Sequence, residues 1–400
     1  MPRTLYFLFL FFVITAISLL IIHFSDHHFM ILDSYAYLTT AENLLDGDGN
    51  IFEHGGVRRF NSIWPVGYPL LICAAHLLFQ LPVFWASKVV NWLGIGVILL
   101  IFKKISSRNL LPLLLLNGTY IKVFSYSASE GIFITLLFVL ALILVPLTKN
   151  KPVPVVTWAA LTACCIALFT VRYIGLFAVA VVGLYALYFI WKKDYVRFFG
   201  AGIVITLTVA FATGYLLWNH AESGFYTGGT GRLQGIRLPA GIMIPHIIEA
   251  LFNEFLLVKD LDIATYSWDF AVIGGLLLQV AVMVLVFFRW RVERRRGDAS
   301  FDLLDPVFVN LLVVALVYFV LLMATWMTSV VDPLGPRFLS PFSILVWTAI
   351  LYWLSADGNI RIYEKVRNYV AIVLILSVVN VMPGKFGMER LSVFIESRWK

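Results

Sequence analysis

Long apolar segments separated by short polar ones run through most of the chain. The first extends from Leu5 to Phe24 and follows a single arginine, Arg3. About 20 predominantly apolar residues suffice for a helix to cross a bilayer. The segment is too long for a signal-peptide core and no small-residue cleavage site follows it, so we expect a retained membrane helix. Further spanning helices are predicted near residues 85–102, 110–128, 130–147, 155–172, 174–191, 198–218, 269–288, 307–327, 338–354 and 369–383.

Basic residues in the short stretches between these segments set the expected sidedness. Six stretches together hold more than half of the 30 lysines and arginines. By the positive-inside rule all six face the cytoplasm, and so does the N-terminus. Their basic residues are Arg3; Lys103, Lys104 and Arg108; Lys149 and Lys151; Lys192, Lys193 and Arg197; Arg289, Arg291, Arg294, Arg295 and Arg296; and Arg361, Lys365 and Arg367.

The number of crossings depends on one short apolar piece, residues 68–81. Arg3 and Lys103 share a side only if the chain crosses an even number of times between them, yet three apolar segments lie there. The piece 68–81 is the shortest of the three, so we expect it to be re-entrant or to lie against the bundle at the outer face. That gives 11 crossings and an outside tail at 384–400. The alternative is 12 crossings, with 68–81 spanning a thinned region of bilayer.

Composition supports the membrane assignment. The 400 residues are 61% hydrophobic and 13% charged, whereas soluble domains are about 45–50% apolar and 25% charged. We therefore expect an all-α integral membrane protein with one transmembrane domain over 1–400. The net charge of +7 is accounted for by the basic stretches, and no aromatic-interleaved basic tract suggests nucleic acid binding. The three cysteines, Cys73, Cys164 and Cys165, lie in apolar segments and are expected as buried thiols.

Two long segments are expected on the outer face. The first, 25–67, is rich in acidic residues and histidine, and its residues 34–45 predict a short juxtamembrane helix that Gly47 is suited to end. The second, 219–268, is rich in glycine and then amphipathic. It predicts a helix in the membrane interface, with Ile247, Ile248, Leu251, Phe252, Phe255 and Leu256 at helical spacing and Glu249, Asn253 and Glu254 between them.

Asp33 is the first candidate for chemistry. It lies a few residues beyond the first apolar segment, at the start of the predicted short helix. A carboxylate between apolar surface and water can accept a proton from a substrate hydroxyl. The plainer interpretation is that Asp33 caps the helix, a position that suits aspartate. The residues alone leave both open.

Several short motifs, taken in order, resemble a known family. An acidic residue after the first span and a short helix ending in Leu-Leu-Asp-Gly-Asp-Gly resemble the opening of the GT-C superfamily of membrane glycosyltransferases. The likeness is to the protein-mannosyltransferase-like enzymes that use polyprenyl-phosphate sugars. It covers residues 1–345 approximately. The further motifs are Trp64-Pro-Val-Gly-Tyr68-Pro-Leu-Leu, Ser127-Ala-Ser-Glu130-Gly-Ile-Phe, Thr170-Val-Arg172-Tyr173-Ile-Gly175-Leu and Gly335-Pro-Arg337-Phe-Leu-Ser-Pro341.

The resemblance implies a fold, a reaction and roles for residues. It implies a GT-C type bundle of 11–12 transmembrane helices, in which Asp33 is the catalytic base on the extracytoplasmic face. An acceptor hydroxyl on a glycan, lipid or protein would displace the lipid phosphate directly, with inversion at the anomeric carbon. Arg172 and Arg337, and less strongly Lys122, would hold the phosphate, because cations stabilise the charge that develops there. The alternative for the arginines is snorkelling or pairing with Glu130 or Asp332.

The remaining polar candidates have less specific roles. Glu130 opens a span and could orient an arginine or hold the acceptor, or merely compensate a helix dipole. Glu53, His54, Tyr37 and Tyr68 are expected around the acceptor or behind the site.

No cofactor and no metal site are predicted. The adjacent His27 and His28 cannot both ligate one ion comfortably, although the resemblance leaves a divalent cation open. The glycine-rich stretch 224–232 lacks the ending of a nucleotide-binding loop. We expect it to be mobile, as in a loop that covers substrate.

The sequence is also compatible with two other functions. A transporter or flippase for a lipid-linked or anionic substrate would place ionisable groups near mid-membrane, between broken helices. A non-catalytic scaffold would leave Asp33, Arg172 and Arg337 dispersed in the fold.

Overall fold

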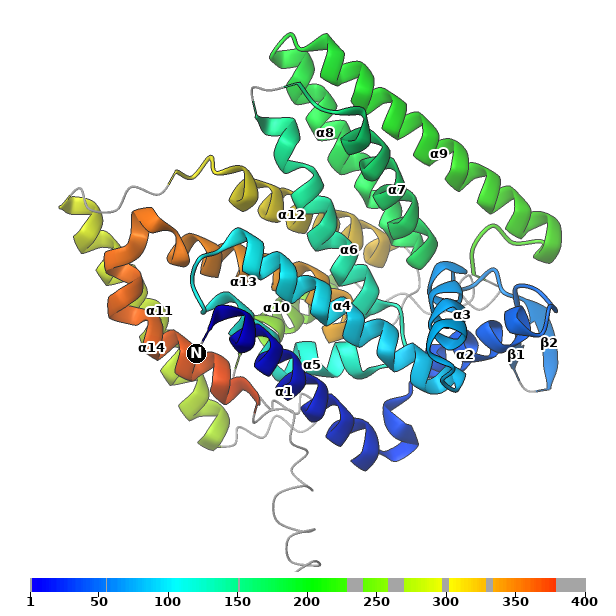
Figure 1. Ribbon diagram of the computed structural model, residues 1–400, viewed down its shortest axis with the longest axis horizontal. Coiled ribbons are helices and arrows are strands. Elements are labelled where there is room, and N and C mark those ends of the chain that lie inside the picture. The colour runs from blue at the N-terminus through cyan, green and yellow to red at the C-terminus, as the bar shows by residue number, and fades with distance from the viewer. Residues whose placement is uncertain are drawn as a thin grey trace, which may run out of the picture.

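The protein is a bundle of helices with one small β-hairpin (Figure 1). The computed structural model describes residues 2–54, 56–149, 152–228, 240–257, 270–296, 302–328 and 334–378. The long helices are α1 (Arg3–Phe24), α4 (Val83–Ile105), α6 (Glu130–Ile143), α7 (Val155–Val171), α8 (Phe177–Trp191), α9 (Tyr195–Ser223), α10 (Ala240–Phe255), α11 (Phe270–Arg295), α12 (Pro306–Thr328), α13 (Pro336–Ser355) and α14 (Ile360–Leu376). The shorter elements are α2 (Leu32–Leu45), α3 (Gly67–Phe79), α5 (Gly118–Ser125), the strands β1 (Ile51–His54) and β2 (Val57–Phe60), and the 3₁₀ turns η1 (Asp26–Phe29), η2 (Leu111–Leu116), η3 (Val145–Thr148), η4 (Tyr173–Leu176) and η6 (Asp357–Asn359).

The all-α, multi-pass membrane class predicted from the sequence is confirmed. Within the described residues, eight helical segments are long and apolar enough to cross a bilayer, fewer than the 11 predicted. They are Arg3–Phe24, Val83–Ile105, Glu130–Thr148, Tyr173–Trp191, Tyr195–Ser223, Ile273–Arg295, Pro306–Thr328 and Pro336–Ser355. The predicted span 155–172 corresponds to α7, which has 17 residues. The predicted span 369–383 overlaps α14 and extends past the described residues.

The spanning helix predicted at 110–128 is wrong. The segment divides into η2 and the eight-residue α5. Pro112 lies at the start of the 3₁₀ turn, and the Asn117 side chain ends that turn by accepting a hydrogen bond from the Thr119 amide. An asparagine in that position caps a new helix rather than continuing the old one. The two pieces are almost wholly buried, so their apolar residues serve the protein core, which the hydropathy pattern cannot distinguish from a membrane span.

Helix α3 agrees with the expectation that residues 68–81 do not cross the membrane. Its 13 residues extend about 20 Å at 1.5 Å per residue, less than the roughly 30 Å of hydrocarbon in a bilayer. It packs against α2, α4 and α7 at one end of the bundle. Figure 1 shows it beside α2 and the hairpin, at the opposite side of the view from the N-terminus.

The predicted helix in segment 25–67 is confirmed as α2. Gly47 ends it with φ +85°, a left-handed conformation that suits glycine. The hairpin that follows was not predicted. Its strands pair antiparallel, with Ile51 opposite Phe60 and His54 opposite Val57. The Gly-Gly pair between the strands is a recognised hairpin signal.

Part of segment 219–268 is described, and it corrects one expectation. The amphipathic stretch forms α10, but Glu254 is only 3% exposed rather than at a polar surface. Its carboxylate accepts hydrogen bonds from Ser340 and Ser343 of α13 at 3.0 and 2.6 Å. A buried carboxylate is tolerated where hydroxyls satisfy it. The remainder of this segment at 229–239 and 258–268, the predicted tail at 384–400 and Asp332 lie outside the described residues.

Basic residues from several of the stretches predicted to face the cytoplasm lie at one end of the bundle, here called the basic end. Arg3 donates to the carbonyl of Lys103 at 2.9 Å, and Arg108 pairs with Asp357 at 3.0 Å. Lys365 pairs with Glu293. These contacts join α1, α4, α11 and the start of α14, as the positive-inside pattern predicts. That this end is cytoplasmic stays a prediction.

Candidate functional site

Arg337 lies at the start of a buried helix, where a cation requires partners. Gly335 precedes α13 in an extended conformation and Pro336 takes the first helical position, for which its fixed φ is suited. Arg337 therefore lies in the first turn. The helix dipole is positive there and disfavours a cation, so carboxylates must compensate it.

Glu130 and Arg172 occupy helix ends that suit their charges. Glu130 is the first residue of α6, and Arg172 directly follows the last residue of α7. A carboxylate is favoured at a helix N-terminus and a cation at a C-terminus. Gly175 lets the chain turn back at Arg172, because a Cβ there would lie 2.1 Å from the carbonyl oxygen of Leu168. Only glycine permits this close approach of two backbone segments.

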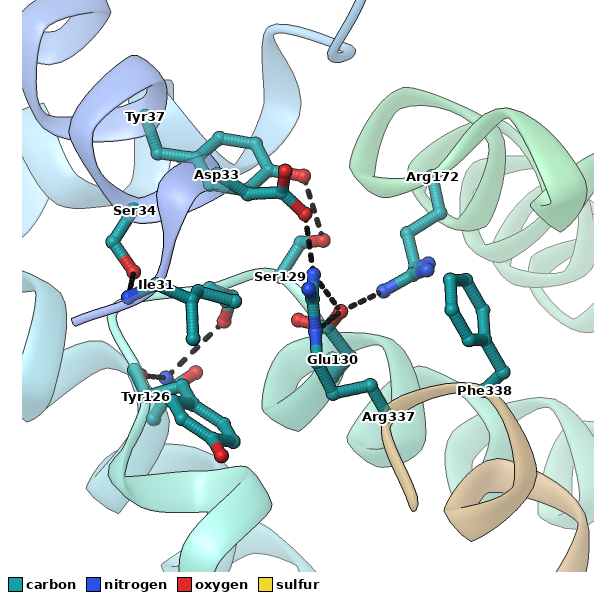
Figure 2. Close-up of polar contacts among 12 residues, drawn as sticks. Ile31, Asp33, Ser34, Tyr37, Tyr126, Ser129, Glu130, Arg172, Arg337 and Phe338 are labelled. Atoms are coloured by element: carbon teal, nitrogen blue, oxygen red, sulfur yellow. Dashed lines mark hydrogen bonds and ion pairs between the residues drawn. The ribbon is translucent and has the colours of Figure 1, made fainter. Parts of the chain in front are cut away.

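Four ionisable side chains from distant parts of the sequence converge in one cluster, here called the ionic cluster: Asp33, Glu130, Arg172 and Arg337. Figure 2 shows Arg337 between the two carboxylates, with Arg172 approaching Glu130 from the other side. The Arg337 guanidinium pairs with the Asp33 carboxylate. Its Nε and Nη2 lie 2.9 and 2.8 Å from Glu130 Oε1, and Arg172 Nη1 lies 2.6 Å from the same oxygen. The cluster joins α2, α6, α13 and the end of α7.

The ionic cluster is largely buried and formally neutral. The Glu130 side chain is fully buried, while those of Asp33, Arg337 and Arg172 remain 23%, 22% and 16% exposed. Burial is the largest single influence on the pKa of Arg172 and would lower it, but the Glu130 carboxylate together with Tyr37 and Tyr318 raises this pKa. Both arginines therefore stay charged, and the cluster opens to solvent on its Asp33 side rather than on its Glu130 side.

One buried atom of the cluster leaves capacity for a ligand. Glu130 Oε2 is buried and has no hydrogen-bond partner among the described residues, an arrangement that costs free energy unless a ligand or water supplies a donor. The Arg172 guanidinium lies 5.9 Å from the ring centroid of Phe133 and 5.7 Å from that of Phe338. Both rings stabilise its charge by cation–π attraction and hold its plane in place.

Asp33 does not cap helix α2. The cap position belongs to Ile31, and its amide donates to the Ser34 hydroxyl at 3.1 Å. The Asp33 side chain instead reaches Arg337, 304 positions away in sequence. The plainer interpretation left open by the sequence is therefore not what the structure shows.

Tyr37 and Tyr68 lie behind the ionic cluster. The Tyr37 hydroxyl is 2.9 Å from the hydroxyl of Ser129, next to Glu130. Burial raises the pKa of Tyr37 well above its ordinary value, so its hydroxyl stays protonated. The Tyr68 ring packs edge-on against Tyr37 at 5.1 Å. Tyr68 donates to the carbonyl of Ser87 at 3.2 Å and thereby fixes α3 to α4 rather than entering the cluster.

One face of α4 holds the connection from Ser125 to Glu130, and sequence reasoning missed it. Lys88 is fully buried, and its ammonium donates to the Ser125 carbonyl at 2.7 Å. Asn91 donates to the carbonyls of Tyr126 and Ala128 at 2.8 and 3.3 Å. These bonds position the residue that opens α6, Glu130. The available signal was a lysine and an asparagine inside an apolar segment, where polar side chains are rare and serve a purpose.

The other predicted site residues lie outside the cluster. Lys122 is half-buried on α5 and forms no ion pair with the described carboxylates. Glu53 is exposed on β1 and lines a neighbouring cavity of about 290 Å³ with Tyr35, Arg59 and Trp64. Leu32, which precedes Asp33, and Ala36, one helical turn further along α2, line it too. The prediction for the His54 side chain lies outside what the structure describes.

His27 and His28 form a left-handed turn rather than a ligand pair. Both have positive φ, 56° and 51°, as does Phe29 at 56°. The Phe29 ring stacks on Tyr126 at 4.5 Å and ties the turn to the α5–α6 connection. Within the described part of the chain, no group of three or more histidine, cysteine, aspartate or glutamate side chains is placed to hold a metal ion. The three cysteines are buried and free.

Comparison of the chain with known protein families, with curated proteins and with solved structures finds no match in any of the three. The likeness to GT-C enzymes therefore rests on the sequence motifs. Three of the residues that those motifs single out, Glu130, Arg172 and Arg337, meet Asp33 in the ionic cluster.

Proposed function

We propose that this protein is a membrane glycosyltransferase of GT-C type. It transfers a sugar from a polyprenyl-phosphate donor to an acceptor hydroxyl, at the extracytoplasmic end of the bundle. The observation that carries the proposal is the meeting of Asp33, Glu130, Arg172 and Arg337 in one partly exposed cluster. Such a transfer needs a base and a phosphate-binding cation side by side, and these four residues supply both.

In the proposed reaction the donor phosphate exchanges with Asp33 on Arg337. A guanidinium binds phosphate oxygens bidentately, and Arg337 has its most accessible carboxylate partner in Asp33, which is 23% exposed. Glu130 is fully buried and stays paired with both arginines. Donor binding therefore frees the Asp33 carboxylate, so the base becomes available only when the phosphate is present.

The acceptor approaches from the cavity beside α2. This cavity is lined by Leu32, the residue before Asp33, and by Tyr35, Glu53 and Trp64. Asp33 takes the proton of the acceptor hydroxyl, and the oxygen forms a bond to the anomeric carbon. The bond from that carbon to the phosphate oxygen breaks, and its electron pair leaves with the lipid phosphate, which Arg337 and Arg172 stabilise. The anomeric configuration inverts.

The rival functions fit the geometry less well. A transporter would use ionisable groups near mid-membrane, whereas Glu130 is the first residue of α6 and Arg337 the second of α13. A scaffold would leave the four residues dispersed, and they are in contact. Both facts favour chemistry at an interface.

The proposal is tested with purified protein in lipid nanodiscs. A panel of polyprenyl-phosphate sugars is added together with an acceptor extract, and release of polyprenyl phosphate and the configuration of the product are measured. We expect one donor to be consumed with inversion. Asp33→Asn should lower the rate at least about 100-fold, the usual contribution of a general base.

Asp48→Asn is the matched control. Asp48 lies in the same outer segment and also pairs with an arginine, Arg58, but on the exposed hairpin side. Its activity should equal that of the wild type. Wild-type activity in Asp33→Asn, or retention of configuration, would refute the proposed role of Asp33. Absence of turnover with every donor would refute the proposed reaction class.

A further inference from the structure

A long, mainly apolar groove runs between α11 and α13, apart from the ionic cluster, with α14 lining one part of it and α12 the other. Two adjoining cavities of about 230 and 490 Å³ form it, and they share Trp290, Ile350 and Trp353 as lining residues. Arg337 of the ionic cluster and Trp353 of the groove are 16 residues apart on α13, which is about 24 Å along a helix. The groove therefore belongs to the basic end of the bundle, not to the proposed active site.

The dimensions of the groove match one leaflet of a bilayer. Its apolar wall runs along α11 from Gln279 to Trp290, which are 11 positions apart, or about 16 Å along a helix. Half of the hydrocarbon core is about 15 Å thick. Gln279 closes the far end, because its side chain is engaged by the Leu257 amide at 2.8 Å and the Phe255 carbonyl at 2.9 Å.

A cation, Arg294, lies at the mouth of the groove, and no described carboxylate pairs with it. Arg294 lines the second cavity, one helical turn beyond Trp290, and its guanidinium lies 5.1 Å from the Trp290 ring centroid. Two other cations at this end are paired, Lys365 with Glu293 and Arg108 with Asp357. Arg294 is exposed and forms no ion pair with any carboxylate in the described part of the chain.

We propose that this groove binds an anionic glycerophospholipid from the leaflet at the basic end. One acyl chain lies along α11 against Ile350, and the headgroup phosphate is held by Arg294, whose fork-shaped guanidinium fits phosphate oxygens. Trp290 and Trp353 lie between chain and headgroup, the depth at which indole rings collect in membranes. Basic pockets between membrane helices bind such headgroups. This lipid is separate from the donor substrate, and its binding does not depend on the proposed reaction.

The test uses the purified full-length protein and native mass spectrometry in mild detergent. Phosphatidylglycerol and phosphatidylcholine with identical acyl chains are titrated in parallel. We expect one phosphatidylglycerol molecule to bind at least about tenfold more tightly than phosphatidylcholine, because a hydrogen bond to a charged group contributes about that much affinity. Arg294→Gln should abolish this preference. The matched control, Arg295→Gln, changes an exposed neighbour that does not line the groove and should keep it.

Ile350→Trp tests the position of the chain independently of charge. Ile350 lines both cavities and is 38% exposed, so a larger side chain fills the groove at the surface without entering the core. It should weaken binding of both lipids. Equal affinity for the two lipids, an equal loss in Arg295→Gln, or unchanged binding in Ile350→Trp would overturn the proposal.

Discussion

At the scale of single residues, Glu130 is the side chain on which the ionic cluster depends. Three guanidinium nitrogens lie within 2.9 Å of one of its carboxylate oxygens, and the side chain is fully buried. Buried ion pairs often contribute little net free energy when both partners are present. Removal of one partner is costly, because the other charge stays buried without compensation.

Glu130→Gln should therefore destabilise the protein strongly. We expect the free energy of unfolding to fall by about 3–5 kcal/mol, measured by denaturant titration of the purified protein in detergent micelles. Glu222→Gln is the matched control, because Glu222 is exposed on α9, and it should change this free energy by less than about 0.5 kcal/mol. A change of under 1 kcal/mol in Glu130→Gln, comparable to the control, would contradict the assigned charge network.

At the scale of elements, the turn after α7 sets where Arg172 lies. The chain leaves α7 at Arg172 and folds back through η4, so that Gly175 nearly touches the carbonyl of Leu168. The close approach admits no side chain. The turn, rather than the length of α7, therefore determines that Arg172 reaches the ionic cluster.

Gly175→Ala should disrupt this turn. Its Cβ would lie 2.1 Å from a backbone oxygen, so η4 must shift and carry Arg172 away from Glu130. We expect a lower melting temperature and reduced sugar transfer. Gly183→Ala, in α8, meets nothing within 4 Å and should leave stability unchanged or raise it by up to about 1 kcal/mol, since alanine favours a helix. Similar effects of both substitutions would contradict the packing described here.

The elements also show what the sequence could predict. The long apolar segments and the basic stretches between them predicted the membrane class and the basic end. The pattern of residues 34–45 predicted helix α2. The span at 110–128 was wrong because hydropathy reports burial, and burial in a protein core has the same composition as burial in lipid. The hairpin was missed although its Gly-Gly turn is a local signal. Only side-chain contacts could show that Glu254 faces two serines of α13.

The candidate site, like the fold, could be predicted from the sequence only in part. The motifs identified Glu130, Arg172 and Arg337 one by one, because each lies at a helix end beside a proline, glycine or aromatic residue, whereas Asp33 was identified by its place after the first apolar segment. The sequence left open that the arginines pair with Glu130, and the structure shows this pairing for both Arg172 and Arg337. The pairing of Arg337 with Asp33 was not predicted, because it joins segments 304 positions apart. Lys88 and Asn91 were missed because they lie inside a predicted span, whose pattern is dominated by apolar residues.

At the scale of the whole molecule, the two proposed binding sites lie at opposite ends of the bundle. The ionic cluster lies near α2 and α3, and the groove with Arg294 lies at the basic end. Figure 1 shows α2 and α3 on one side of the molecule and the N-terminus, with α11 and α14, on the other. The proposed donor and the proposed bound phospholipid would thus occupy different leaflets.

The proposed mechanism depends on the exchange of Asp33 for a phosphate on Arg337, and the affinity for polyprenyl phosphate reports this exchange. If Asp33 competes with the phosphate for Arg337, Asp33→Asn should bind polyprenyl phosphate several-fold more tightly than the wild type, while transferring sugar at least about 100-fold more slowly. Equilibrium binding to both proteins in nanodiscs gives the two dissociation constants. Weaker or unchanged binding of polyprenyl phosphate by Asp33→Asn would contradict the account.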